Sequence, residues 1–365
     1  MRRSKQGRYR RDTTAAQGGL AGLTWPDIIA LDELKSTRKT AMPKLPSRPA
    51  PLFGALLAGG LLLFASPGFG LVRAAATPMA TQSDQTASVL RGRIAPPHEE
   101  TLKAYVAAGA TETKAHILTD REWALVESAI ADLPELYRRV LERRLARLSF
   151  VDAPSSLGTA LTRSSDGPNG EPVFDITIRA EVLEQSLSAF LTQKEAALFS
   201  PDGSGYSVRV TAGDASALTY ILLHEATHVV DRTLDVTTGG GPFKAVWVDY
   251  RRLAQPYAAS VIARSVYRRE PKLPLAQSPS LYRALAQAPF VSLYSTASAG
   301  EDFAELMAWR ELSSRFGTAL RIQVLDGHGA EIVSIEPLQS TSVRLRLQAA
   351  EAVLARASAA APEKI

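Results

Sequence analysis

The pattern of apolar and polar positions along this 365-residue chain predicts a mixture of helices and short strands. Several stretches have the apolar content and the end signals of helices. Asp120 and Asp214 are the expected N-caps of two of them, and Pro134 is expected to break or kink one. The expected helices cover residues 98–117, 120–145, 214–234, 298–315 and 340–359.

Shorter stretches alternate between apolar and polar residues, which is typical of half-buried strands. Three single strands are expected, at 147–151, 173–178 and 206–210, and residues 321–335 are expected to form a hairpin. The glycine-containing residues between the first two strands are predicted to be loops, and residues 243–290 to be mostly helical between prolines. The pattern therefore indicates an α+β protein with a small sheet and many helices.

An apolar run at 52–72 stands apart from these elements. Lys44 and Arg48 precede the run, and Ala74-Ala75-Ala76 follows it, which is the arrangement of a cleaved secretory signal. About 50 residues before the run is long for such a signal, and a true start at Met42 would give the usual length. The alternatives are a disordered basic extension before Met42, and a retained membrane anchor, because the run is about as long as a bilayer span. The sequence favours an exported protein, periplasmic or secreted, over one anchored in the membrane and facing outward.

The amino-acid composition excludes several classes of catalytic and metal site. The chain has no cysteine, so thiol nucleophiles, disulfides and cysteine-ligated metals are excluded. The net charge of +5 comes from residues 1–76, which hold 12 Lys/Arg against 4 Asp/Glu and leave 30 against 33 for the remainder. The remainder is slightly acidic, which gives no indication of a nucleic-acid partner.

The most specific motif is His224-Glu225-Ala226-Thr227-His228. Two histidines four positions apart on a helix point from one face and can share a zinc ion. Glu225 is then placed to take a proton from water as general base. The alternative is a helix whose two histidines serve only in packing.

A catalytic zinc of this type needs a third protein ligand. Glu301 is the preferred candidate, since a predicted helix begins there and its apolar residues can seat it against the first helix. Glu305 lies on the same face, so one of the pair is expected to ligate the metal while the other holds a ligand histidine. The alternative is that both are ordinary acidic residues that stabilise the start of a helix. His328 is the weaker candidate because it lies at the expected hairpin turn.

Two segments resemble the gluzincin class of zinc metallopeptidases, most closely the peptidase domain of anthrax lethal factor and its relatives. The first runs from His224 to Asp231 and matches that group's His-Glu-x-x-His-x-Val-Asp. The second has Tyr294, six intervening residues and then Glu301-Asp302-Phe303-Ala304-Glu305, with Asp302 where the group has Phe. Together they cover about residues 220–312.

The resemblance implies a zincin-like fold, with a small mixed sheet packed on the active-site helix. It implies that His224, His228 and Glu301 hold one Zn²⁺, that Glu225 is the general base, and that Tyr294 donates a hydrogen bond to the oxyanion. Tyr294 is alternatively a core tyrosine. Asp231 either orients a ligand or caps the next turn.

Two further expectations concern the surroundings of the metal. The strand at 173–178 is expected to be the edge strand that pairs with extended substrate. Glu301 lies 73 positions after His228, which is more than is typical of the class, so a lid or insertion is expected within 237–290.

The sequence therefore predicts an exported zinc metallopeptidase that acts on peptide or protein substrates. The alternatives are a catalytically silent zinc-binding module and a zinc hydrolase of a non-protein amide such as a peptidoglycan cross-link. The expected parts are a leader (1–76), a linker (77–97), a helical accessory segment (98–146), a catalytic domain (147–318), and a C-terminal hairpin and helix (319–365).

Overall fold

The computed structural model describes residues 88–168, 170–237 and 243–365. The expected leader, with its apolar run at 52–72 and the start at Met42, lies outside the described residues, as do 238–242 of the expected lid. Within the described ranges, no helix is both long enough and apolar enough to cross a bilayer.

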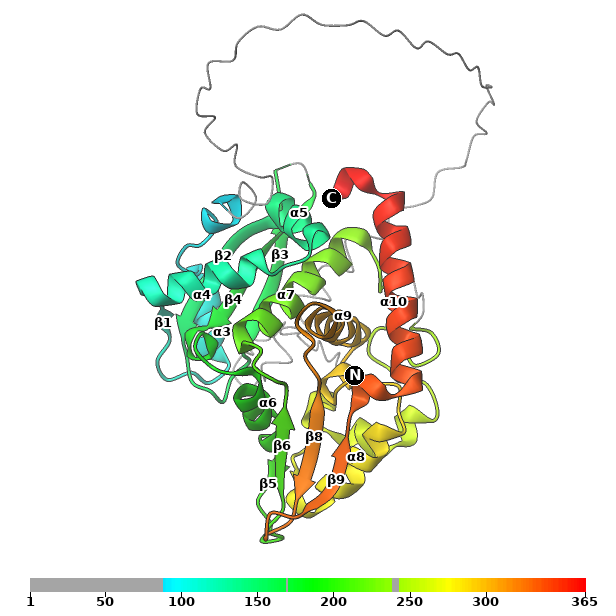
Figure 1. The fold of residues 1–365 in the computed structure, drawn as a ribbon. Coiled ribbons are helices and arrows are strands. Elements are labelled where there is room, and N and C mark those ends of the chain that lie inside the picture. Colours follow the sequence, from blue (N-terminus) through cyan, green and yellow to red (C-terminus); the bar gives the residue numbers. More distant parts are fainter. Residues whose placement is uncertain (1–87, 169, 238–242) are drawn as a thin grey trace, which may run out of the picture.

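A four-stranded mixed sheet forms one side of the molecule (Figure 1). Its strand order is β1-β2-β4-β3, with β2 and β4 parallel and the other pairs antiparallel. The strands are β1 (Lys114–Ala115), β2 (Leu145–Asp152), β3 (Ala160–Asp166) and β4 (Pro172–Arg179).

This sheet confirms two predicted strands and corrects two expectations. Residues 147–151 lie in β2 and residues 173–178 in β4. However, β4 is paired on both sides, so 173–178 is not the edge strand. The edge beside β4 is β3, which lies in a stretch expected to be loops, and its register pairs Ala160 with Ile178 and Asp166 with Pro172.

The helix α7 (Ala217–Leu234) lies between this sheet and α9 (Ala299–Phe316) (Figure 1). The Ser216 hydroxyl accepts the Leu218 N–H and caps the start of α7, so the N-cap expected at Asp214 is wrong by two positions. Asp235, in the left-handed conformation, ends the helix. Almost every residue of α7 is buried, which makes it the central helix of the core.

Three helices come before β2, and the second and third of them pack on α7. The first ends at Ala107 and not near residue 117, and the break predicted at Pro134 is confirmed. Thr119, not Asp120, caps the second helix in a capping box with Glu122. These helices are α3 (Glu99–Ala107), α4 (Asp120–Ala131) and α5 (Glu135–Arg144).

A second sheet joins distant parts of the chain. The predicted hairpin is confirmed as β8 (Arg321–Leu325) and β9 (Glu331–Ile335), and β8 also pairs with β6 (Ser207–Thr211). Because β6 precedes α7 and the hairpin follows α9, this sheet holds the two helices together at one end (Figure 1).

Residues 243–290 are less helical than predicted. Most of the segment consists of loops and 3₁₀ turns, with one α-helix, α8 (Ser278–Ala286). Prolines throughout the segment remove backbone donors and prevent longer helices. The short elements are η2 (Tyr257–Ala259), η3 (Val261–Arg264), η4 (Val266–Arg268), β7 (Leu273–Pro274), which pairs with β5 (Phe199–Ser200), and η5 (Leu275–Gln277).

The C-terminal helix α10 (Thr341–Ala360) packs against α9 and crosses it (Figure 1). Arg346 of α10 forms two hydrogen bonds with the carboxylate of Asp302 on α9, and Trp247 Nε1 donates a third at 2.7 Å. One hydrophobic cluster includes Val126, Leu223 and Val343, so it spans the three parts into which the sequence divided residues 98–365.

Candidate metal centre

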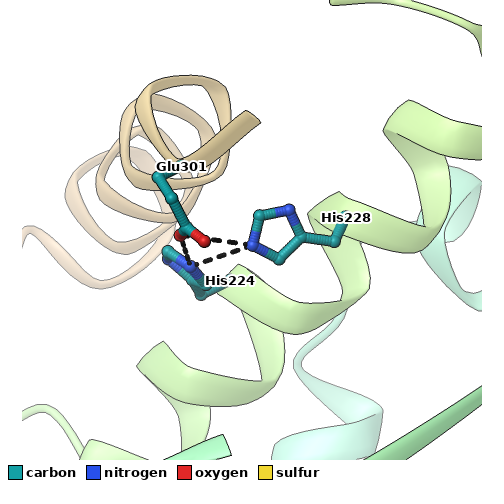
Figure 2. A group of neighbouring side chains, drawn as sticks. All are labelled: His224, His228 and Glu301. Carbon is teal, nitrogen blue, oxygen red and sulfur yellow. Dashed lines mark hydrogen bonds and ion pairs between the residues drawn. The ribbon is translucent and has the colours of Figure 1, made fainter. Parts of the chain in front are cut away.

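Two histidines of α7 and one glutamate of α9 meet where these helices pack together (Figure 2). His224 and His228 are one helical turn apart and point from the same side of α7. The side of α7 that carries them is as buried as the rest of the helix, with only 5% of His224 and 9% of His228 exposed.

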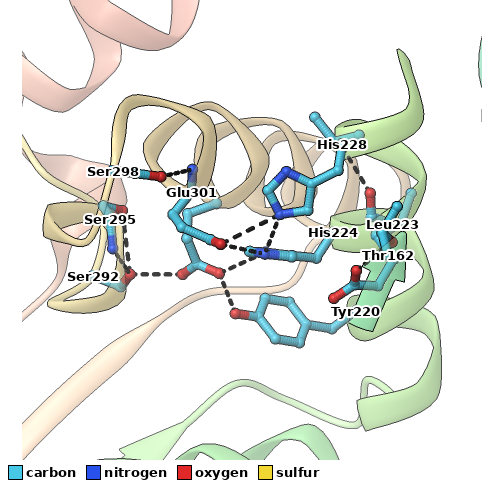
Figure 3. A network of polar contacts seen from close by, with 12 residues as sticks. Thr162, Tyr220, Leu223, His224, His228, Ser292, Ser295, Ser298 and Glu301 are labelled. Atoms are coloured by element: carbon cyan, nitrogen blue, oxygen red, sulfur yellow. Dashed lines mark hydrogen bonds and ion pairs between the residues drawn. The ribbon is translucent and has the colours of Figure 1, made fainter. Parts of the chain in front are cut away.

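The start of α9 places Glu301 opposite the two histidines. Ser298 is the N-cap of this helix, and its hydroxyl accepts the N–H of Glu301 at 3.2 Å. The cap fixes the first turn of α9, so the Glu301 side chain projects from a rigid helix start towards α7 (Figure 3).

The three side chains bring one nitrogen or oxygen atom each to a common point. Glu301 Oε2 lies 2.9 Å from His224 Nε2 and 3.3 Å from His228 Nε2, and the two Nε2 atoms are 3.2 Å apart. Donors at about 2.0–2.1 Å from a tetrahedral zinc ion lie about 3.3–3.4 Å from one another. The observed triangle is therefore close to one face of such a tetrahedron.

The chemistry of the donor set also suits zinc. Two imidazole nitrogens and one carboxylate oxygen are ligands that zinc accepts, and three protein ligands leave a fourth position open. Three buried polar atoms this close to one another are also costly unless a proton or a cation lies between them. His224, His228 and Glu301 thus fit a zinc site in number, type and spacing.

Glu305, on α9, lies beside the Nδ1 atom of His224. One carboxylate oxygen, Oε1, lies 3.0 Å from His224 Nδ1, at an angle unfavourable for a hydrogen bond, and accepts the hydroxyl of Tyr220. The other, Oε2, accepts the hydroxyl of Ser292 at 2.6 Å. A carboxylate beside Nδ1 favours the proton on that nitrogen, which leaves the lone pair of Nε2 for a metal.

These contacts shift the proton affinities of the cluster. Burial raises the pKa of Glu305, but the close contact with His224, its charge and the charge of Lys194 outweigh burial and bring the pKa to about 2. Burial lowers the pKa of His224, but Glu301 and Glu305 raise it to about 10. For Glu301, His228 and His224 outweigh burial and hold the pKa well below its usual range. Both carboxylates are therefore ionised at neutral pH.

Glu225 follows His224 on α7 and is buried with 8% of its surface exposed. Its Oε2 accepts the hydroxyl of Thr162 at 2.6 Å. Thr162 lies on β3, the strand that the sequence did not predict, so this contact was missed. The sequence gives little signal for this strand, because Ala160-Leu161 is followed by five polar residues at 162–166.

Tyr294 lies in η6 (Tyr294–Thr296), directly beside His224. The two rings are stacked, with centroids 5.6 Å apart and planes inclined by 27°. Lys194 Nζ, on α6 (Leu187–Ala196), lies 3.8 Å from the centroid of the Tyr294 ring, a cation–π contact. Burial, together with the charges of Glu301 and Glu225, raises the pKa of Tyr294 well above its usual value, so the phenol keeps its proton.

Three other residues singled out in the sequence lie outside the metal triangle. Both carboxylate oxygens of Asp231 accept hydrogen bonds from Thr237, so Asp231 caps the turn after α7. His328 is exposed at the hairpin turn, where its backbone N–H donates to Asp326 Oδ1. Asp302 points to Arg346 and Trp247 and not to the metal triangle.

Comparisons of this chain with protein-family models, with curated proteins and with solved structures gave no significant match.

Proposed function

We propose that this protein is a zinc-dependent peptidase of the gluzincin type. The observation that carries the proposal is the buried triangle of His224 Nε2, His228 Nε2 and Glu301 Oε2, whose sides are 2.9, 3.2 and 3.3 Å. A zinc ion held there supplies Lewis acidity, which lowers the pKa of water and polarises the carbonyl group of an amide.

The remaining residues have separate roles in this hydrolysis. Glu225 takes the proton of the attacking water and later gives it to the leaving amine, the work of a general base and then a general acid. Tyr294 keeps its proton at neutral pH and donates a hydrogen bond to the carbonyl oxygen as negative charge develops on it. Glu305 keeps the His224 ring in its tautomer and orientation.

The packing around the triangle supports an active site on a rigid frame. The metal ligands come from α7 and α9, which contact each other extensively, and the base is tied to β3. Groups on packed helices keep their positions better than groups on loops. The packing of these elements therefore favours a site that is already formed before substrate binds.

The experiment compares wild-type protein with Glu225→Gln on a library of quenched fluorescent peptides. The proposal predicts that both proteins copurify with zinc and that turnover by the variant falls by a factor on the order of 1,000 or more. Glu311→Gln is the matched control, because Glu311 is a buried carboxylate on α9 that pairs with Arg310. Equal turnover by Glu225→Gln and wild type would overturn the proposal.

A further inference from the structure

The hydrogen bond between Thr162 and Glu225 connects the four-stranded sheet to the proposed general base. The two residues are 63 positions apart in the chain, and the Thr162 hydroxyl donates to Glu225 Oε2 at 2.6 Å. Both side chains are buried, with 7% of Thr162 and 8% of Glu225 exposed. A short, buried hydrogen bond to a carboxylate belongs to the stronger class of such bonds.

The fold leaves Thr162 little freedom in this position. It lies on β3 opposite Ile176 of β4, and the alternation of a strand turns it towards α7 while Leu161 packs with Tyr105 on the other face. The branched Cβ of threonine restricts its χ1 rotation. The hydroxyl is therefore presented from a rigid strand at a fixed point beside α7.

We propose that Thr162 is a positioning residue for Glu225, an inference that rests on the proposed function. The terminal torsion of a glutamate side chain is soft, so an unanchored carboxylate samples many orientations. The hydroxyl of Thr162 holds Oε2 and thereby fixes the direction of Oε1, the oxygen left to take the proton of the attacking water. Proton transfer needs that oxygen within hydrogen-bond reach of the water, so the orientation of the carboxylate contributes directly to kcat.

The first test uses Thr162→Val, which removes the hydroxyl and keeps the shape, and Thr162→Ser, which keeps the hydroxyl. Thr177→Val is the matched control, because Thr177 is buried on the neighbouring strand β4 and its hydroxyl bonds Ser149 at 2.8 Å. Zinc content, kcat and KM are measured with the peptide that wild type cleaves best in the fluorescent library.

The inference predicts that Thr162→Val lowers kcat by roughly 10- to 100-fold while KM and zinc content stay close to wild type. Thr162→Ser should restore most of the lost kcat, and Thr177→Val should leave kcat and KM unchanged. If Thr162→Val keeps the wild-type kcat, or if Thr162→Ser is as slow as Thr162→Val, the inference is wrong.

A second test needs no turnover. Thr162→Val, Glu225→Ala and the double variant form a cycle, in which Tm is measured on the zinc-loaded proteins. In the wild-type background, Thr162→Val should lower Tm by about 4 °C. When Glu225 is already alanine, the same change should lower Tm by much less. Additive shifts would overturn the inference and leave the proposed function standing. Undiminished turnover by Glu225→Gln would overturn the proposed function, whatever the cycle shows.

Discussion

His224 Nε2 lies 2.9 Å from Glu301 Oε2, although 77 positions separate the two residues in the chain. Extensive packing of α7 on α9 brings them together, and the cap at Ser298 fixes the first turn of α9, which carries Glu301. The metal site is thus a product of tertiary packing, and the changes that test it fall on both helices.

The support from Glu305 should be measurable in zinc affinity. Glu305→Gln keeps the shape and the oxygen that accepts from a hydroxyl, but it removes the charge 3.0 Å from His224 Nδ1. We expect zinc affinity, measured by competition with a chelator, to fall by about 10- to 100-fold. Glu311→Gln on the same helix is the control and should keep wild-type affinity. If Glu305→Gln keeps the wild-type zinc affinity, the charge of Glu305 does not act on zinc binding through His224.

Zinc binding should release protons at neutral pH. In the metal-free site the pKa of His224 is raised to about 10, so this ring is protonated at pH 7 and must lose its proton to bind metal. Apparent zinc affinity should therefore rise by about tenfold per pH unit between pH 6 and 8. Calorimetry in buffers of different ionisation enthalpy gives the number of protons released. A zinc affinity that does not change over this range would contradict a protonated His224 in the metal-free site.

The ion pair between Asp302 and Arg346 should contribute to stability. Arg346→Met removes the cation that pairs with the fully buried Asp302 carboxylate, and we expect the free energy of unfolding to fall by about 3–5 kcal/mol. The double variant Arg346→Met with Asp302→Asn should be more stable than Arg346→Met alone, because no uncompensated charge remains buried. Urea unfolding measures both, and a double variant less stable than the single one would contradict this account.

Glu195 on α6 should make stability depend on pH. Burial, partly offset by the hydroxyl of Tyr282, raises its pKa to about 7 from 4.5. Between these values the folded state binds more protons than the unfolded state, so the free energy of unfolding falls as pH rises from 4.5 to 7. Glu195→Gln removes this loss and should be about 3 kcal/mol more stable than wild type at pH 8, with little difference at pH 4. If Glu195→Gln and wild type differed in stability by the same amount at pH 4 and pH 8, the raised pKa of Glu195 would be refuted.

The sequence predicted those parts of the site that depend on local geometry. The spacing of His224 and His228 needs only a helix to place both on one face, and that helix is present at 217–234. Glu301 was identified from a predicted helix start, and the structure places it against both histidines.

The parts that depend on non-local pairing were not predicted. The position of a strand within a sheet is set by its partners, so the pattern of 173–178 could not show that β4 lies inside the sheet. Residues 160–166 are largely polar and follow a loop, and they become a strand by pairing with β4 along its length. As a result, Thr162 was not recognised as a neighbour of Glu225.

Zinc content of the purified protein tests the central claim most directly. Elemental analysis of wild type, after removal of loosely bound metal, should give one zinc per chain. Glu301→Gln should lose its zinc at a chelator concentration at least about 100-fold lower than the concentration that removes zinc from wild type. Glu311→Gln should match wild type. Wild-type protein without zinc, or Glu301→Gln that holds zinc as tightly as wild type, would contradict the assignment of His224, His228 and Glu301 as a metal site.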